Sequence, residues 1–209
     1  MKIQDFDKII CLNLEKRIDR KNICNSIFVK HNIVVEYFKA IDGNTIIIDG
    51  KISKGAMGAS LSHKKIFEYV QKNNWNTVLI LEDDIEFHEE LETRFEDYYR
   101  EVPSDWKMIY FGGNHCFNIR PKMISEHVCL LQHTYALHCY AIKQETIQHL
   151  LEQITEENIY NKEIDVHLAD IQKKIPCYGF IPHLAWQKSG YSDIEKQNVN
   201  YDYLKIPPL

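Results

Sequence analysis

Short apolar runs alternate with amphipathic segments along most of the chain. Runs rich in branched aliphatic and aromatic residues predict strands, at residues 8–14, 34–38, 77–81, 108–111, 128–131, 138–142 and 177–180. Apolar residues at helical spacing predict helices at residues 17–31, 57–73, 89–100, 144–153 and 163–173. This alternation indicates an α/β fold. Ile181-Pro182 follows the last predicted strand, and we expect the last 25 or so residues, which include Pro207-Pro208, to be irregular.

The size and composition of the chain fit one globular domain with a full core. It has 209 residues, of which 44% are hydrophobic and 26% are charged. A net charge of -5 and basic doublets such as Lys64-Lys65, without a longer basic cluster, argue against a nucleic-acid partner. No stretch approaches the roughly 20 apolar residues that cross a bilayer, so we expect no transmembrane segment.

The start of the chain and its cysteines bear on the cellular compartment. The opening residues, MKIQDFD, lack the apolar centre of a signal peptide. Six cysteines are scattered without a Cys-x-x-Cys pair, and several lie in apolar runs, where a free cysteine acts as a small hydrophobic residue. We therefore expect a reduced, cytoplasmic protein. The sequence does not indicate an oligomeric state.

Three consecutive carboxylates, Glu82, Asp83 and Asp84, directly follow the apolar run at residues 77–81. In open α/β sheets, ligands bind at the carboxyl ends of the strands. Carboxylate oxygens are ligands for hard divalent cations, which in turn bind phosphate. The triplet therefore predicts a site for a metal ion that carries a phosphorylated ligand.

Several segments, read together in order, resemble the motifs of glycosyltransferase family 25, which includes lipooligosaccharide sugar transferases and collagen galactosyltransferases. The matching segments are ICLNLEKRIDR at 10–20, AIDG at 40–43, GAMGASLSH at 55–63, LILEDD at 79–84, LAWQ at 184–187 and SDI at 192–194. No single motif carries the resemblance, but their order and spacing do. The chain departs from the pattern at Ala56, where the family usually has Glu, and at Ala59, where it usually has Cys.

The resemblance implies a GT-A type fold, a single Rossmann-like domain whose central sheet is mixed, mostly parallel and flanked by helices. It also implies a UDP-hexose donor, with galactose or glucose favoured, a divalent metal such as Mn²⁺ or Mg²⁺, and transfer with inversion. Residues 1–111 would form the nucleotide-sugar half, and residues 112–209 the acceptor half with a closing loop. The acceptor would be a glycan, a lipid-linked sugar or a protein side chain.

For the metal, Asp84 is the first choice of ligand, and Glu82 shares a face with it if the strand continues. Asp83 would then turn toward the ribose or a neighbouring cation. If the chain turns at Asp83, these roles shift. His183 and Gln187, in the carboxyl-terminal loop, are the candidates that complete the metal and diphosphate shell. The histidines that could replace His183 are His133, His138 and His167.

For the nucleotide, the candidates lie in three places. Asn13 ends the first strand, and Arg17 and Arg20 stand one turn apart at a helix start, where they could reach a pyrophosphate or a uracil edge. Asp42 and Gly43 form a turn that could hold the ribose. Ser62 and His63 are expected near the amino end of the helix at 57–73, where free N–H groups favour phosphate.

For the acceptor, Asp165 is the candidate catalytic base, because inverting transfer needs a group that takes the proton of the acceptor hydroxyl. It stands at a predicted helix start, so a plain N-cap is the alternative reading. Tyr135 and His138 are candidates for the wall of the acceptor groove.

Three functions remain open on the sequence. The first is an active metal-dependent transferase. The second is a catalytically degenerate family member that binds a nucleotide sugar or glycan, which Ala56 and Ala59 suggest. The third is another metal-dependent phosphoryl enzyme, against which the absence of a G-x-x-x-x-G-K-[ST] loop argues.

Overall fold

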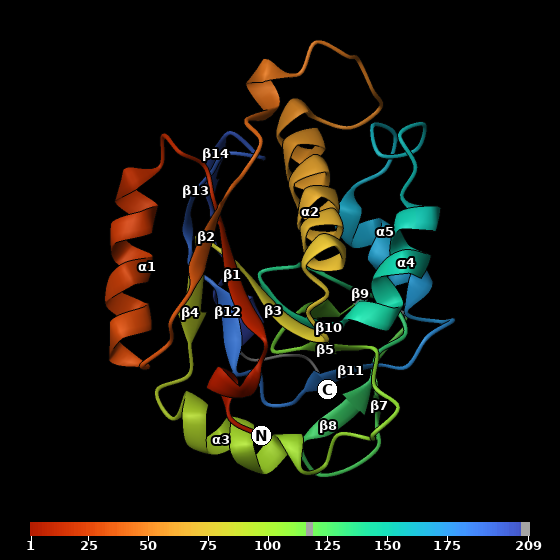
Figure 1. Ribbon diagram of the computed structural model, residues 1–209. Coiled ribbons are helices and arrows are strands. Elements are labelled where there is room, and N and C mark those ends of the chain that lie inside the picture. The colour runs from red at the N-terminus through yellow and green to blue at the C-terminus, as the bar shows by residue number, and fades with distance from the viewer. Residues whose placement is uncertain (116–118, 206–209) are drawn as a thin grey trace.

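A computed structural model describes residues 1–115 and 119–205, and its centre is an eight-stranded sheet (Figure 1). The strand order is β2-β1-β3-β10-β5-β11-β8-β7. These strands are β1 (Lys8–Asn13), β2 (Glu36–Lys39), β3 (Thr77–Glu82), β5 (Met108–Tyr110), β7 (Lys122–Met123), β8 (Val128–Leu130), β10 (Cys139–Lys143) and β11 (Cys177–Phe180). The predicted α/β class and the mixed sheet are confirmed.

The strand directions divide this sheet into two parts. Strands β2, β1 and β3 run parallel, so their carboxyl ends meet at one edge of the sheet. Beyond β3 only the β5–β11 pair is parallel, and β10 runs antiparallel to both of its neighbours. Among the described residues, three of the seven pairings in this sheet are parallel, fewer than the mostly parallel sheet that we expected.

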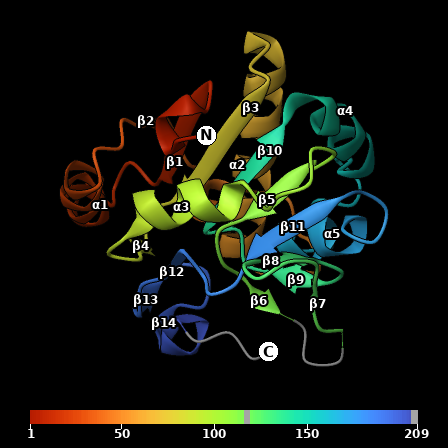
Figure 2. The same cartoon turned by 90° about the horizontal axis from the view of Figure 1, so that it is seen from below.

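The sheet is covered on both faces by helices (Figure 2). Helices α1 (Ile18–Lys30) and α3 (Leu91–Tyr99) pack on one face. Helices α2 (Lys54–Asn73), α4 (Gln144–Gln153) and α5 (Ile164–Ile171) pack on the other. Because both faces are buried, the central strands are apolar at successive positions: Ile9 and Cys11 face α1 and α3, whereas Ile10 and Leu12 face α2.

The expected helix start at residue 57 is wrong, because α2 begins three residues earlier, at Lys54. Ser53 is its N-cap, and the Ser53 side chain accepts a hydrogen bond from the Ala56 N–H at 3.1 Å. The start of α2 lies against the turn at Gly43 so closely that a Cβ there would stand 1.8 Å from the Lys54 carbonyl oxygen. Only glycine allows this approach.

Short elements lie outside the main sheet. Strands β4 (Ile85–Phe87) and β12 (Ala185–Gln187) pair, as do β13 (Gly190–Ser192) with β14 (Gln197–Val199) and β6 (Asn114–His115) with β9 (Thr134–Tyr135). Three 3-10 turns complete the described part of the fold: η1 (Ile3–Asp5), η2 (Gly43–Thr45) and η3 (Asp202–Lys205). Up to residue 205, the carboxyl-terminal segment that we expected to be irregular therefore contains three strands and a turn. In the part of the chain described here, no helix is long and apolar enough to cross a membrane.

Candidate functional site

A cavity of about 370 Å³ opens where the parallel strands β1 and β3 end. Residues from both halves of the chain line it. The two halves meet in the sheet, because β10 of the second half lies between β3 and β5 of the first. The predicted site residues that line this cavity are Arg20, Asp42, Gly43, Ser62, His63, Glu82, Asp83, Asp84, Asp165 and Gln187. Asn13, Arg17 and His183 are not among the lining residues.

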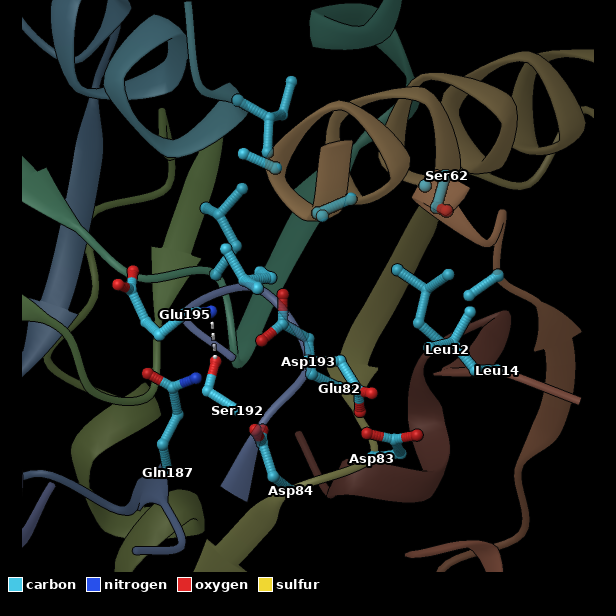
Figure 3. A pocket seen from close by; sticks show the side chains of 18 of the residues that line it. Leu12, Leu14, Ser62, Glu82, Asp83, Asp84, Gln187, Ser192, Asp193 and Glu195 are labelled. Carbon is cyan, nitrogen blue, oxygen red and sulfur yellow. Dashed lines mark hydrogen bonds between the residues drawn. The ribbon is translucent and has the colours of Figure 1, made fainter. Parts of the chain in front are cut away.

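The carboxylate triplet lies at the end of β3, on one side of the cavity (Figure 3). The strand ends at Glu82, and the chain turns through Asp83 and Asp84 into β4. Glu82 and Asp84 are therefore not alternate residues of one continuing strand. The roles expected for a continuing strand do not apply, and each carboxylate has to be considered with its own neighbours.

Asp83 is held on both oxygens by the protein itself. The Asn13 side-chain amide donates to its Oδ2 at 2.7 Å, and Arg20 Nη1 donates to its Oδ1 at 2.7 Å. Burial raises the pKa of Asp83, and Arg20 opposes that shift. The structure therefore uses Asp83, predicted for the ribose or a second cation, to fix Asn13 and Arg20.

Asp84 is the carboxylate with an unused oxygen. Its Oδ2 accepts from Arg20 at 3.3 Å, but its buried Oδ1 has no hydrogen-bond partner among residues 1–115 and 119–205. Burial and the charge of Glu82 raise the pKa of Asp84 to about 7. An orphaned buried carboxylate oxygen beside a second carboxylate fits a hard divalent cation, which would relieve both the missing contact and the repulsion.

The predicted second and third metal ligands are arranged differently from expectation. Within the described residues, no three His, Cys, Asp or Glu side chains group as a metal site. His183 is buried away from the cavity: its Nδ1 donates to the Leu204 carbonyl at 2.7 Å, and its Nε2 lies 3.1 Å from Nε2 of His115. Both ring nitrogens are thus engaged, so the structure does not place His183 with Asp84.

Gln187 is brought to the carboxylates by strand pairing. In the β4–β12 pair it lies opposite Ile85, the residue after Asp84. The Lys188 N–H donates to the Asp84 carbonyl at 2.6 Å, which fixes the two segments together. The Gln187 side chain acts to lower the pKa of Asp84. Gln187 therefore neighbours Asp84, and its place in a metal or diphosphate shell stays a prediction.

Ser62 and His63 lie in the third turn of α2, so their backbone N–H groups belong to the helix and do not point at a ligand. The Ser62 hydroxyl donates to the Gly58 carbonyl at 2.6 Å and accepts from the Ile41 N–H at 2.8 Å. His63 contacts Tyr140 and Glu82 through its two ring nitrogens. The prediction of a phosphate site at a helix amino end is wrong here, because the helix starts earlier.

On the nucleotide side, Asp42 caps the short turn η2. Its Oδ1 accepts from the Asn44 N–H at 3.1 Å, and its carboxylate forms an ion pair with Lys16. Lys16 and Asn44 also line the cavity, and neither was predicted from the sequence. The turn thus presents a cation and an amide beside Gly43.

Asp165 is the second residue of α5, whose N-cap is Glu163, so the plain N-cap reading is wrong. Its Oδ1 accepts from the Val166 N–H at 2.8 Å and its Oδ2 from the Ala136 N–H at 3.4 Å, near the start of α5. It also lines the cavity, and burial raises its pKa. Tyr135 lines the same wall, whereas His138 is fully buried behind it.

The carboxyl-terminal hairpin closes one side of the cavity. Arg17 forms an ion pair with Asp193, and Arg20 Nη2 donates to the Tyr191 carbonyl at 2.7 Å. Arg17, expected at the diphosphate, therefore anchors this hairpin. Its residues at 192–196, together with Tyr201 and Tyr203, line the cavity. Sequence reasoning assigned none of them a role, although the SDI segment at 192–194 pointed to this region.

Comparisons with known proteins agree with one another. The sequence model of glycosyltransferase family 25, described as an LPS biosynthesis protein, matches residues 47–168. A glycosyltransferase 25 family member of Aedes aegypti is 28% identical over 176 residues, covering 69% of this chain and 28% of that protein. Procollagen galactosyltransferase 2 of Mus musculus is 24% identical over 171 residues, covering 70% and 27%.

The chain thus spans less than a third of the length of these two relatives. Among solved structures, A197 from STIV aligns with a TM-score of 0.48 and 10% identity, covering 93% of this chain and 94% of that one.

Proposed function

Because the chain belongs to glycosyltransferase family 25, we propose that it is a transferase that moves a hexose from a UDP-sugar to a hydroxyl acceptor. Galactose or glucose is the favoured hexose, and transfer proceeds with inversion at the anomeric carbon. The observation that carries the proposal is the unpartnered Asp84 Oδ1, buried at the carboxyl end of β3 in the cavity where an α/β sheet binds its ligand.

Asp84 is the residue that would hold a divalent cation, Mn²⁺ or Mg²⁺, with Glu82 and Gln187 beside it. Such a cation, when bound, stabilises the negative charge that develops on a departing diphosphate. Arg20 adds a fixed positive charge on the same side. Its contacts to Asp83, Asp84 and the Tyr191 carbonyl hold the guanidinium in one orientation.

The nucleotide side of the cavity is formed by the ends of β1 and β2. Leu12, Leu14 and Ala40 give it an apolar wall, and Lys16 and Asn44 give it polar groups beside the turn at Asp42 and Gly43. This combination suits a flat base attached to a ribose, since apolar contact supports the ring while a few polar groups fix its orientation. Residues 1–111 accordingly contribute the nucleotide half in our proposal.

Asp165 is the proposed catalytic base on the opposite wall. Its carboxylate takes the proton of the acceptor hydroxyl while the acceptor oxygen bonds to the anomeric carbon, and the bond from that carbon to the diphosphate oxygen breaks with its electron pair. Two backbone N–H groups orient the carboxylate. Burial raises the pKa of Asp165, which makes it a stronger base than an exposed aspartate.

The acceptor in this proposal is a glycan, a lipid-linked sugar or a protein side chain. The relatives support both a saccharide and a protein acceptor, because the family is described by LPS biosynthesis and one relative is a procollagen galactosyltransferase. Tyr135, Asn114 and Glu163 line the cavity near Asp165 and offer an aromatic face and polar groups, as sugar sites use. Residues 112–205 thus contribute most of the acceptor half.

Calorimetric titration with UDP tests the donor assignment. We expect UDP to bind in the presence of manganese and to bind at least tenfold more weakly with a chelator, because the diphosphate and the carboxylates repel one another without the cation. UMP, which lacks the second phosphate, is the matched ligand control and should show a smaller manganese effect. Equal affinity for UDP with and without metal would contradict the proposed role of Asp84.

One observation favours binding without turnover as the second candidate. Ala56 and Ala59 both line the cavity, at the positions where the family pattern has Glu and Cys. If tight UDP binding is found but no UDP-sugar is consumed, this second candidate replaces the first.

A further inference from the structure

A buried chain of polar groups runs behind the cavity and ends at Glu82. The Tyr140 hydroxyl lies 2.9 Å from Nδ1 of His63, and Nε2 of His63 lies 3.2 Å from Oε1 of Glu82. Tyr140 and His63 are almost inaccessible to solvent, with 0% and 1% of the residue exposed. The Glu82 side chain is 26% exposed and lies at the cavity. The chain thus leads from the core to the site.

The chemistry of the partners assigns the protons along this chain. A carboxylate only accepts hydrogen bonds, so Nε2 of His63 carries the hydrogen that is donated to Glu82. In the neutral imidazole, Nδ1 then accepts from the Tyr140 hydroxyl. Among the described residues, no hydrogen bond is found to the second oxygen of Glu82. That oxygen is the one left for a ligand in the cavity.

Three different secondary-structure elements hold this chain of polar groups in place. Glu82 ends β3, His63 is in α2 and Tyr140 is in β10, opposite Ile80 of β3. The Tyr140 ring also packs on Tyr110, with ring centroids 5.9 Å apart. A rotation of the Glu82 carboxylate would break the contact to His63 and leave a buried nitrogen unpaired, which is costly. The carboxylate therefore has one favoured orientation.

From this geometry, and resting on the proposed function of the cavity, we infer that His63 and Tyr140 are positioning residues that fix the orientation of Glu82 toward the bound donor. The polar atoms of both are engaged within the protein, the two ring nitrogens of His63 and the hydroxyl of Tyr140, so they act on the donor through Glu82. Burial alone would raise the pKa of Glu82, but the contact with His63 lowers it and keeps the group a carboxylate. The inference replaces the phosphate contact that the sequence predicted for His63.

Tyr140→Phe is the most direct variant, since it removes one hydroxyl at the far end of the chain and leaves the ring. We expect kcat for UDP release to fall about tenfold, the usual cost of removing an outer partner of a site residue. Tyr110→Phe is the matched control. Tyr110 is equally buried and stacked on Tyr140, lies near Gln172, and its hydroxyl makes no standard hydrogen bond to a described residue. We expect it to leave kcat within twofold.

A double-mutant cycle separates positioning from general packing. If Tyr140 acts through Glu82, then Tyr140→Phe costs about tenfold in the native protein and close to nothing in a Glu82→Ala background. Where Glu82→Ala has no measurable turnover, the same cycle is measured on the Kd of UDP with manganese. Equal losses in both backgrounds would show that Tyr140 acts independently of Glu82 and would overturn the inference.

An NMR measurement tests the hydrogen bonds among Tyr140, His63 and Glu82 without any enzymatic turnover. In a protein labelled with ¹⁵N at histidine, we expect a hydrogen on Nε2 of His63 and an Nδ1 resonance that moves in Tyr140→Phe and stays in Tyr110→Phe. The Nδ1–H tautomer, or an Nδ1 resonance unaffected by Tyr140→Phe, would contradict the proposed hydrogen bonds of His63 to Glu82 and Tyr140. A protein that consumes no UDP-sugar would contradict the proposed function, whereas the histidine spectrum would still decide this inference.

Discussion

The carboxylates at 82–84 differ in what they can bind because their neighbours differ. Asp83 is saturated by Asn13 and Arg20, and Glu82 is tied to His63 on one oxygen. Asp84 shares Arg20 on one oxygen and keeps the other unpaired. Asp83 therefore has a structural role, Glu82 is held in one orientation, and Asp84 has an oxygen that could bind a ligand.

This difference predicts unequal losses of stability for two neighbouring variants. Asp83→Ala should lower the free energy of unfolding by about 2 kcal/mol, because it takes a buried charged acceptor away from both Asn13 and Arg20. Asp84→Ala should lower it by less than half as much, because it also removes an unpaired buried oxygen. Urea unfolding in metal-free buffer measures both. A larger loss for Asp84→Ala than for Asp83→Ala would contradict these assignments.

The pH dependence of turnover should report Asp165. Burial raises its pKa, so the carboxylate takes up a proton at a higher pH than an exposed aspartate, and kcat should fall as the pH drops through that raised value. Asp165→Asn should lower kcat by at least about a hundredfold and leave the Kd of UDP within twofold. An unchanged acidic limb of the pH profile in the variant would exclude Asp165 as the base.

The same pKa shift has a consequence for folding. Since the folded protein binds this proton more tightly than the unfolded chain, the contribution of Asp165 to stability falls as pH rises from the ordinary aspartate pKa through the raised one. Asp165→Asn removes this loss, so the variant should be at least as stable as the native protein at pH 7 and gain nothing at pH 3. Thermal unfolding at the two pH values checks it. If the stability of the variant relative to the native protein is lower at pH 7 than at pH 3, the prediction is contradicted.

Most of the site residues predicted from the sequence line the cavity, but the sequence did not show how they are used. The motif positions identified ten of the residues that line the cavity, Asp84 and Asp165 among them. The sequence did not show that Asp83, Ser62 and His63 direct polar atoms into the protein, because apart from Gly58, which Ser62 contacts, their partners are 19 to 77 residues away in the chain. Pairings at that distance depend on the packing of helices on the sheet, which no local pattern contains.

Among the helices and strands, the length of an element decided whether the hydrophobic pattern of the sequence could predict it. The helix at 144–153 and the strand at 177–180 have the predicted bounds, because several periodic positions mark each of them. Strands such as β4 and β12 have three residues each and owe their existence to each other, across about 100 positions of sequence. Such pairs have no periodicity of their own, so the carboxyl-terminal segment was predicted as irregular.

The start of α2 positions the turn at Gly43 and provides a further prediction. Ser53→Ala removes the only side-chain cap found for this helix among the described residues and should lower the free energy of unfolding by about 1 kcal/mol. Ser53→Asp keeps an acceptor at the same place and should stay within about 0.5 kcal/mol of the native protein. Chemical denaturation distinguishes them. Equal losses in both variants would show that the serine contributes something other than the cap.

At the scale of the whole molecule, the carboxyl-terminal segment returns to the first helix and closes the cavity. Strand β12 pairs with β4 beside Asp84, and the hairpin β13–β14 is tied to α1 by the Arg17–Asp193 ion pair. Both side chains of that pair are partly exposed, 18% for Arg17 and 24% for Asp193. The contact is therefore suited to hold the hairpin in place without contributing much to global stability.

Asp193→Asn should consequently loosen the hairpin and leave the rest of the fold intact. We expect faster amide hydrogen exchange at residues 188–199, a change of at most about 1 kcal/mol in the free energy of unfolding, and a higher KM for the donor. Lys162 and Asp170 form a surface ion pair in another part of the molecule, so Asp170→Asn is the control and should change none of these. Unaltered exchange in the Asp193 variant would show that the ion pair does not hold the hairpin.

The most direct test of the central claim is UDP release from a panel of UDP-sugars, with manganese or with a chelator, by the native protein and by Asp84→Asn. The account predicts that one donor is consumed with manganese, that the chelator abolishes its consumption, and that Asp84→Asn lowers kcat by at least about a hundredfold. Consumption of a donor at the same rate with chelator, or by the variant, would contradict it.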